Sequence, residues 1–255
     1  FKRQNMKIVL SIAGSDSSGG AGIQADIKSG FYHKVFMTTA ITAVTVQNTL
    51  GVTDVVVLKP EFVVKQIKSV IEDFKVNCIK IGMLSSKELI FEVFETIKDL
   101  NIPIVLDPVA ISRAGSKLLD DEAINSLKSN FKYAYLITPN SLEAKLFFDV
   151  ENINDIKNLK DIPTNIIFKN IIKSDNQTVD VLLKKNGKIK IFKGKKADVS
   201  NTHGTGCSFS ASIASLIARD KSLCKSIKKS KQYIYKAIKN APNFGRGNGP
   251  INHIL

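Results

Sequence analysis

This sequence lacks long apolar runs, has few cysteines and contains no low-complexity tract. No stretch approaches the roughly 18 apolar residues that a membrane-spanning helix needs, and no signal-peptide core follows the first residues. The three cysteines form no C-x-x-C pair, and their odd number is typical of free thiols in a reducing compartment. No repeat or Pro/Gly/Ser-rich linker divides the 255 residues. We therefore expect a cytoplasmic protein without a membrane partner and one domain over residues 1–255, with residues 1–5 as a remnant outside the fold.

Acidic residues are scarce relative to basic ones. The chain has 23 aspartates and glutamates against 37 lysines and arginines, which gives a formal net charge of +14. Such an excess can be the footprint of nucleic-acid binding. The lysines are spread through every segment, however, and no arginine-rich or aromatic-interleaved stretch is present. We therefore expect no nucleic-acid partner, and the charge suits an anionic nucleotide substrate.

The sequence does contain an alternation of short β-branched runs with helical patterns. The runs that predict strands are Lys7 to Ala13, Val52 to Leu58, Cys78 to Ile81, Ile102 to Leu106, Ala134 to Ile137 and Ile166 to Phe168. Helices are predicted from Pro60 to Phe74, from a cap at Ser86 toward Leu100, from Ser208 to Arg219 and from Ser222 to Ile238. This α/β alternation predicts a mainly parallel sheet with helices on both faces. The Asn186-Gly187 turn between Val179–Leu183 and Lys188–Phe192 predicts an antiparallel edge hairpin.

A first glycine-rich turn, Gly14 to Gly22, leaves the first strand and opens a helix. It is not a Walker A loop, because Gly20 stands where that loop needs a lysine. The stretch Gly20 to Ala25 fits the dinucleotide pattern G-x-G-x-x-A, but residues 35–51 contain no acidic residue for the ribose. A dehydrogenase is therefore a distant alternative.

A second glycine-rich turn, Asn201 to Cys207, directly precedes a helix rich in small residues. Gly204 and Gly206 permit close approach of a ligand, and the helix start attracts anions, so the turn suits phosphoryl transfer. A turn that merely starts a helix is an equal alternative. At a helix start the pKa of Cys207 is expected to fall, so that it could accept a hydroxyl proton; the alternative is a small buried side chain.

Hard oxygen ligands follow two further strands. Asp107 comes after the strand ending at Leu106, and Asn140 and Glu143 follow the strand ending at Ile137. Such groups suit Mg²⁺, largely through waters. The alternatives are a turn aspartate at Asp107 and an N-cap at Asn140. The three histidines, His33, His203 and His253, have no metal-ligand spacing and are expected in turns or at the surface.

Taken in order, seven segments resemble the hydroxymethylpyrimidine kinase / phosphomethylpyrimidine kinase family of the ribokinase superfamily. They are Ile12–Asp16, Gly19–Asp26, Val46–Thr49, Lys80–Leu84, Val105–Val109, Thr138–Asn140 and Asn201–Cys207. The resemblance implies a ribokinase-like three-layer α/β/α fold, usually a homodimer. It also implies two ATP-dependent phosphorylations of 4-amino-5-hydroxymethyl-2-methylpyrimidine, to the monophosphate and then the diphosphate, in thiamine biosynthesis.

The resemblance also implies roles for individual residues. The pyrimidine pocket falls on Gly14, Ala21, Asp26, Gln47, Met83 and Val109. The anion hole falls on Gly204, Thr205 and Gly206, with Cys207 as the presumed base. ATP and Mg²⁺ are expected near Asp107, Asn140, Glu143, Lys169 and Thr205.

The chain departs from the family pattern at two places. Lys169-Asn170-Ile171-Ile172 stands where the family usually has Lys-Gly-Gly-His, and residues 245–250 replace a Gly-His-Gly pattern. The alternatives are a pyridoxal or pyridoxine kinase, whose substrate also carries a hydroxymethyl group, and a catalytically weak ligand-binding member of the fold.

Overall fold

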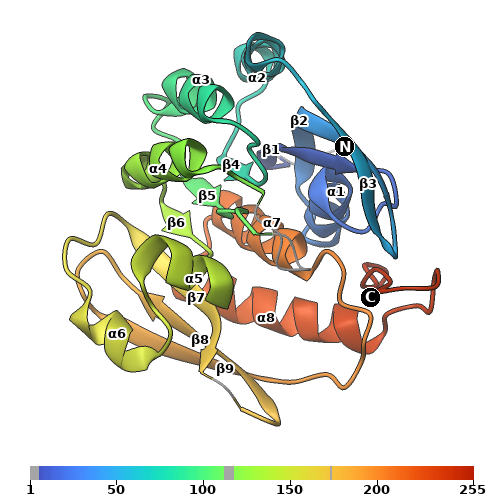
Figure 1. Cartoon of the computed structure of the whole chain (residues 1–255), viewed down its shortest axis with the longest axis vertical. Coiled ribbons are helices and arrows are strands. Elements are labelled where there is room, and N and C mark those ends of the chain that lie inside the picture. The colour runs from blue at the N-terminus through green and yellow to red at the C-terminus, as the bar shows by residue number, and fades with distance from the viewer. Residues whose placement is uncertain (1–5, 112–117, 173) are drawn as a thin grey trace.

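The computed structural model describes residues 6–111, 118–172 and 174–255, so the predicted remnant at residues 1–5 lies outside the described residues. One nine-stranded sheet runs through the molecule in the order β3-β2-β1-β4-β5-β6-β7-β8-β9 (Figure 1). The strands are β1 (Ile8–Asp16), β2 (Phe36–Asn48), β3 (Gly51–Val57), β4 (Cys78–Ile81), β5 (Ile104–Leu106), β6 (Leu136–Ile137), β7 (Asn165–Ile172), β8 (Gln177–Leu183) and β9 (Ile189–Lys195).

The helices fill the crossovers between parallel strands and close the chain. They are α1 (Gly22–Tyr32), α2 (Pro60–Asp73), α3 (Lys87–Ile97), α4 (Asp121–Ser129), the short 3₁₀ helix η1 (Phe131–Tyr133), α5 (Ser141–Phe148), α6 (Ile153–Asn158), α7 (Thr205–Ala218) and α8 (Leu223–Lys239). The predicted cap is present, because Ser86 Oγ accepts from Leu89 N at the start of α3. Among the described residues, no helix combines the length and apolar character needed to cross a membrane.

The two faces of the sheet carry separate apolar cores. Successive residues of a strand point to opposite faces, so Leu10 and Ile12 pack with α2, α3 and α4, whereas Val9 packs with α7 and α8. Figure 1 shows these two helical layers on either side of the strands. The predicted three-layer α/β/α arrangement is confirmed.

The sheet is parallel in its centre and antiparallel at both edges. β1, β2 and β4 to β7 pair in parallel, and the predicted hairpin forms the edge β8–β9. A second antiparallel edge was not predicted: β3 pairs with β2, a 13-residue strand that is absent from the strands expected from the sequence. The first strand also runs further than expected, to Asp16, because Ser15 and Asp16 pair with Val44 and Thr45 after a register shift.

Candidate active site

Five neighbouring parallel strands carry polar side chains on the face that is covered by α7. On this face the apolar residues Val9, Cys78, Val105, Leu136 and Ile167 belong to one core with residues of α7 and α8. Two positions further along each strand, alternation returns the chain to the same face. The residues at these positions are Ser11, Lys80, Asp107, Thr138 and Lys169. A polar row therefore crosses these strands and reaches the carboxyl ends of β5 and β6 at Asp107 and Thr138, the side where ligands collect in open α/β sheets.

Asp107 is the centre of this row. Its Oδ1 accepts from Thr138 Oγ1 at 2.8 Å and from Lys169 Nζ at 2.9 Å, and its Oδ2 accepts from Ser210 Oγ at 3.4 Å. Although burial acts to raise the pKa of Asp107, the ammonium groups of Lys169 and Lys80 hold it below its usual value. The structure thus brings together Asp107 and Lys169, which the sequence assigned to the ATP side of the site.

A second ion pair, Asp26 with Lys80, lies inside the protein. Lys80 Nζ is 2.8 Å from Asp26 Oδ2, which also accepts from Ser11 Oγ, and both side chains are fully buried. Burial raises the pKa of Asp26, although Lys80 acts to lower it. Direct contact of Asp26 with the pyrimidine, as predicted, does not fit a carboxylate without exposed surface. Sequence reasoning missed Lys80, because a lysine inside the strand Cys78–Ile81 carries no sign of its buried partner.

The two glycine-rich turns are in contact. Gly204 has a φ of +81°, and a Cβ there would lie 1.7 Å from Gly20 O, so only glycine fits. Gly22 also has a positive φ, of +54°, and a Cβ there would lie 2.2 Å from Gly14 O. Residues predicted for the pyrimidine pocket, such as Ala21 between these glycines, therefore lie beside the predicted anion hole.

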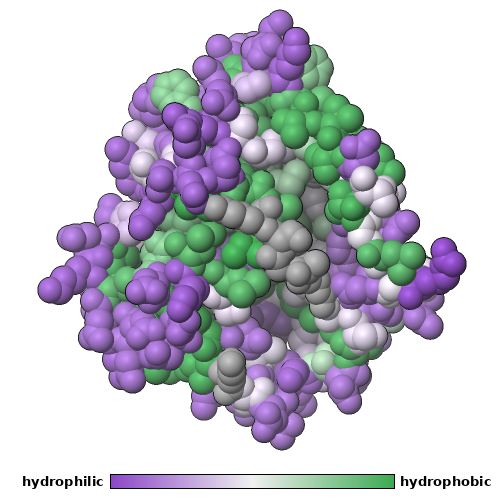
Figure 2. Space-filling model, in the orientation of Figure 1, coloured by the Kyte–Doolittle hydropathy of each residue, from purple (hydrophilic) through white to green (hydrophobic). Residues whose placement is uncertain are grey.

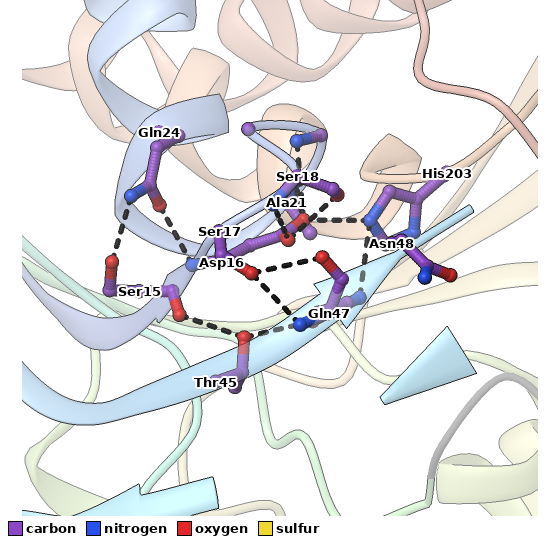
Figure 3. A network of polar contacts seen from close by, with 12 residues as sticks. Ser15, Asp16, Ser17, Ser18, Ala21, Gln24, Thr45, Gln47, Asn48 and His203 are labelled. Carbon is purple, nitrogen blue, oxygen red and sulfur yellow. Dashed lines mark hydrogen bonds and ion pairs between the residues drawn. The ribbon is translucent and has the colours of Figure 1, made fainter. Parts of the chain in front are cut away.

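Asp16 ties the turns together (Figure 3). Its carboxylate accepts from Ser18 N and Ala21 N, each at 2.8 Å, and from His203 Nε2 at 2.8 Å. Although burial acts to raise the pKa of Asp16, these donors hold it well below its usual value. His203, in the second turn as expected, is therefore part of the site; His33 lies in the turn after α1 but is buried rather than at the surface. An aspartate that accepts from amides two and five residues ahead is a turn signal that could have identified Asp16.

The remaining pocket residues converge on the same place. Gln47, at the end of β2, has its amide 3.3 Å from the ring nitrogen Nε2 of His203. A Cβ on Gly14 would lie 3.0 Å from Met83 Cε, so these two predicted contacts are neighbours. Val109 lies in the turn after β5, where its N–H donates to Asp107 O at 2.8 Å.

The start of α7 faces the Asp107–Lys169 pair. A Cβ on Gly206 would lie 3.6 Å from Asp107 Oδ2 and 3.7 Å from Lys169 Nζ. The hydroxyl of Thr205 donates to Thr202 O at 2.6 Å and so closes the turn rather than pointing away from it. The positive end of the helix and a lysine meet here, an arrangement that favours an anion, as predicted for this turn.

Cys207 does not have the low pKa expected at a helix start. Burial raises the pKa of the thiol to about 11, although Lys80 acts to lower it. Burial therefore raises the pKa of Cys207 by more than the positive end of the helix could lower it. At neutral pH the thiol therefore keeps its proton.

Asn140 and Glu143 form a capping box at the start of α5. Asn140 Oδ1 accepts from Leu142 N and Glu143 N, and Glu143 Oε2 accepts from Asn140 N at 2.9 Å. Burial raises the pKa of Glu143 to about 7, although Lys169 acts to lower it. Within the described ranges, no group of three or more His, Cys, Asp or Glu residues could hold a metal. Asp107, Asn140 and Glu143 therefore do not form a ligand cage by themselves, and their role toward Mg²⁺ through waters stays a prediction.

Both departures from the expected family pattern have local explanations. Asn170 has a φ of +52°, a conformation that asparagine tolerates, and its N–H donates to Asp180 Oδ1 at 2.8 Å. It thus supplies the left-handed residue that a glycine would provide. In the later segment, Asn248 Oδ1 accepts from Thr202 N at 2.9 Å and Gly249 N donates to Asn201 Oδ1 at 3.0 Å, so residues 245–250 support the turn before α7.

Comparison with known proteins identifies the family. The family model described as phosphomethylpyrimidine kinase matches residues 16–252. The chain belongs to the phosphomethylpyrimidine kinase family. A hydroxymethylpyrimidine/phosphomethylpyrimidine kinase from Haemophilus influenzae is 39% identical over 98% of this chain and 97% of its own length. The protein is thus a phosphotransferase. Its fold is the ribokinase-like fold that the sequence predicted.

Solved structures resemble the chain over nearly its whole length. A phosphomethylpyrimidine kinase from Clostridium difficile is 38% identical with a TM-score of 0.79, covering 91% of this chain and 100% of that one. A Bacillus subtilis pyridoxal kinase in an ADP complex is 28% identical with a TM-score of 0.88, covering 98% of both chains. Phosphomethylpyrimidine kinases and pyridoxal kinases therefore share this architecture.

Proposed function

We propose that this kinase phosphorylates 4-amino-5-hydroxymethyl-2-methylpyrimidine and then its monophosphate with ATP, in thiamine biosynthesis. The observation that carries the proposal is the contact between the two glycine-rich turns. It sets the predicted pyrimidine residues Gly14, Ala21 and Gln47 beside the anion site at Gly204–Gly206. Relatives with nearly full coverage are named for the same two activities.

In this proposal the substrate hydroxymethyl oxygen attacks the γ-phosphorus of ATP, and the bond from that phosphorus to the bridging oxygen of ADP breaks. The start of α7 and the ammonium of Lys169 would stabilise the charge on the transferred group. Cys207 can take the hydroxyl proton only as a thiolate, which is a minority form when its pKa is about 11. Most of the rate enhancement is therefore assigned to the anion site, since the transition state is loose.

The nucleotide side of the proposal rests on Lys169 and Asp107. Lys169 lies beside Gly206 and would pair with a phosphate of ATP, while Asp107 holds the lysine in place. Mg²⁺ would arrive bound to the ATP phosphates, because the protein oxygens named above do not form a ligand cage. A single domain over residues 1–255 and a cytoplasmic location stay predictions; the one sheet shared by all nine described strands supports the former.

The test is incubation of the purified protein with Mg-ATP and, separately, the hydroxymethylpyrimidine, its monophosphate and pyridoxal. Mass spectrometry should detect the pyrimidine monophosphate and diphosphate. The structural similarity to a pyridoxal kinase makes pyridoxal kinase the second candidate, and phosphorylation of pyridoxal alone would replace the pyrimidine assignment. Absence of every product would favour the ligand-binding alternative.

We further propose a homodimer that covers the edge strand β3. β3 ends the sheet within the described part of the chain, and its residues Val52, Val55, Val56 and Val57 are between 41% and 61% exposed. Figure 2 shows apolar surface on the side of the molecule where β3 lies. An uncovered apolar edge invites pairing, and a two-fold axis brings two identical edges together.

Light scattering after gel filtration tests the dimer. Wild type should have twice the mass of the chain, and Val56→Lys should be monomeric. Phe91→Lys, at an equally exposed residue of α3, is the control and should remain dimeric. A monomeric wild type would refute the proposal.

A further inference from the structure

The side-chain amide of Gln47 lies between two polar partners (Figure 3). Its Nε2 is 3.3 Å from His203 Nε2, and its Oε1 is 3.2 Å from Thr45 Oγ1. An amide can turn by 180° about its last bond, which exchanges the donor and the acceptor. The two partners therefore decide which atom lies on which side.

His203 disfavours an amide donor from Gln47. Its Nε2 lies 2.8 Å from Asp16 Oδ2. The donors around Asp16 hold the pKa of this carboxyl well below its usual value, so Asp16 is an acceptor and His203 Nε2 carries the proton. A ring N–H facing the amide NH₂ would place two donors together. With Oε1 of Gln47 in that position, the ring N–H, whose main acceptor is Asp16 Oδ2, faces a second acceptor instead of a donor.

Thr45 requires a donor from Gln47. Its hydroxyl lies 3.0 Å from Ser15 O, an acceptor, and a hydroxyl has only one proton to give. When that proton goes to Ser15 O, the oxygen lone pairs face the amide. Nε2 of Gln47 then donates to Thr45 Oγ1, so both neighbours select the same amide orientation.

We propose that Thr45 and His203 fix the Gln47 amide and thereby make the site selective for a 4-aminopyrimidine. The fixed amide keeps one N–H and one oxygen lone pair unused, which match the ring nitrogen and the amino group on one edge of the substrate. This inference rests on the proposed function, in which Gln47 meets that edge. Thr45 and His203 are positioning residues that act through Gln47.

A 4-oxo analogue of the substrate is the sharpest probe. In 5-hydroxymethyl-2-methylpyrimidin-4(3H)-one, a carbonyl replaces the amino group and the neighbouring ring nitrogen carries a proton. Donor and acceptor are thereby exchanged with almost no change in shape. A fixed amide should reject this analogue, because its polar groups would be left unpaired, whereas an amide free to turn can accept it.

The experiment compares wild type with Thr45→Val, Thr45→Ser and a control, Thr53→Val. Thr53, on β3 of the same hairpin, gives its hydroxyl proton to Val46 O and not to the Gln47 side chain. The readout is the ratio of kcat/KM for the amino substrate to that for the 4-oxo analogue. The analogue is also assayed as a competitive inhibitor, so that slow turnover does not hide its binding.

Thr45→Val should lower the ratio by about tenfold, which corresponds to the loss of one hydrogen bond. Thr45→Ser keeps the hydroxyl and should restore the ratio to within about twofold of wild type, as should Thr53→Val. A general loss of folding would reduce both substrates equally and leave the ratio unchanged. An unchanged ratio in Thr45→Val, with the amino substrate still phosphorylated, would overturn this inference alone. No wild-type turnover of the amino substrate would refute the proposed function and the inference with it.

Discussion

At the scale of the residue, Gly206 and Cys207 lie in one helix turn, and we expect different roles for them in the proposed reaction. A Cβ at Gly206 would meet only ordinary contacts, and the residue does not have positive φ, so alanine should fold normally there. The added methyl group would nonetheless stand between the phosphate and the charges of Asp107 and Lys169. Cys207 is a protonated thiol at neutral pH.

We expect Gly206→Ala to lower kcat about 100-fold through loss of transition-state stabilisation. Cys207→Ala should lower kcat by only about tenfold, because a loose transition state depends little on a base. Steady-state kinetics with the pyrimidine, together with melting curves that show intact folding, measure both. A larger loss for Cys207→Ala than for Gly206→Ala would contradict this division of roles.

At the scale of the element, the Lys80–Asp26 pair joins β4 to α1 beneath the two turns. Both side chains have no exposed surface. Asp26 Oδ1 has no hydrogen-bond partner among the described residues, so the carboxylate depends on Lys80 and Ser11. A buried ion pair that loses one partner leaves an uncompensated charge.

Lys80→Met should therefore lower the free energy of unfolding by roughly 3–5 kcal/mol, measured by urea denaturation. The double variant Lys80→Met/Asp26→Asn should recover part of this loss, because it removes the stranded charge. Lys87→Met breaks the exposed pair with Glu122 and should have no measurable effect. Equal stability of wild type and Lys80→Met would show that the Asp26 carboxylate does not depend on Lys80 for its stability in the folded protein.

At the scale of the whole molecule, the buried His33 makes the stability of the fold depend on pH. His33, after α1, is 7% exposed and lies 2.6 Å from Ser212 Oγ on α7. Burial, with Arg219 and Lys229 nearby, lowers the pKa of His33 from 6.5 to about 4. Below pH 6.5 the unfolded chain therefore binds a proton that the folded protein does not.

Stability should be unaffected by this group above pH 6.5 and should fall as the pH drops from 6.5 toward 4. The expected loss is about 3 kcal/mol, from the shift in pKa. Thermal unfolding across this pH range measures it, in a single transition if the chain is one domain. In His33→Asn, stability should fall less between pH 7 and pH 4 than it does in wild type. An equally steep fall in this variant would assign the pH dependence to other groups.

The sequence by itself determined the features that depend on neighbouring residues. Apolar periodicity and turn chemistry predicted most parallel strands, the β8–β9 hairpin and the two glycine-rich turns, because these signals lie within a few positions of each other. It also placed Asp107 directly after β5, whereas Lys169, expected to follow a strand ending at Phe168, lies within the longer β7. The family motifs predicted the ribokinase-like kinase that the comparisons then identified.

Only the tertiary structure decided the features that depend on distant partners. Asp16 and His203 are 187 positions apart, and Lys80 and Asp26 are 54 apart, so no local pattern announces either pair. The raised pKa of Cys207 likewise comes from burial, which the helix start alone does not reveal. Desolvation and charge pairing are set by packing across the whole chain, and they therefore appear only when the fold is known.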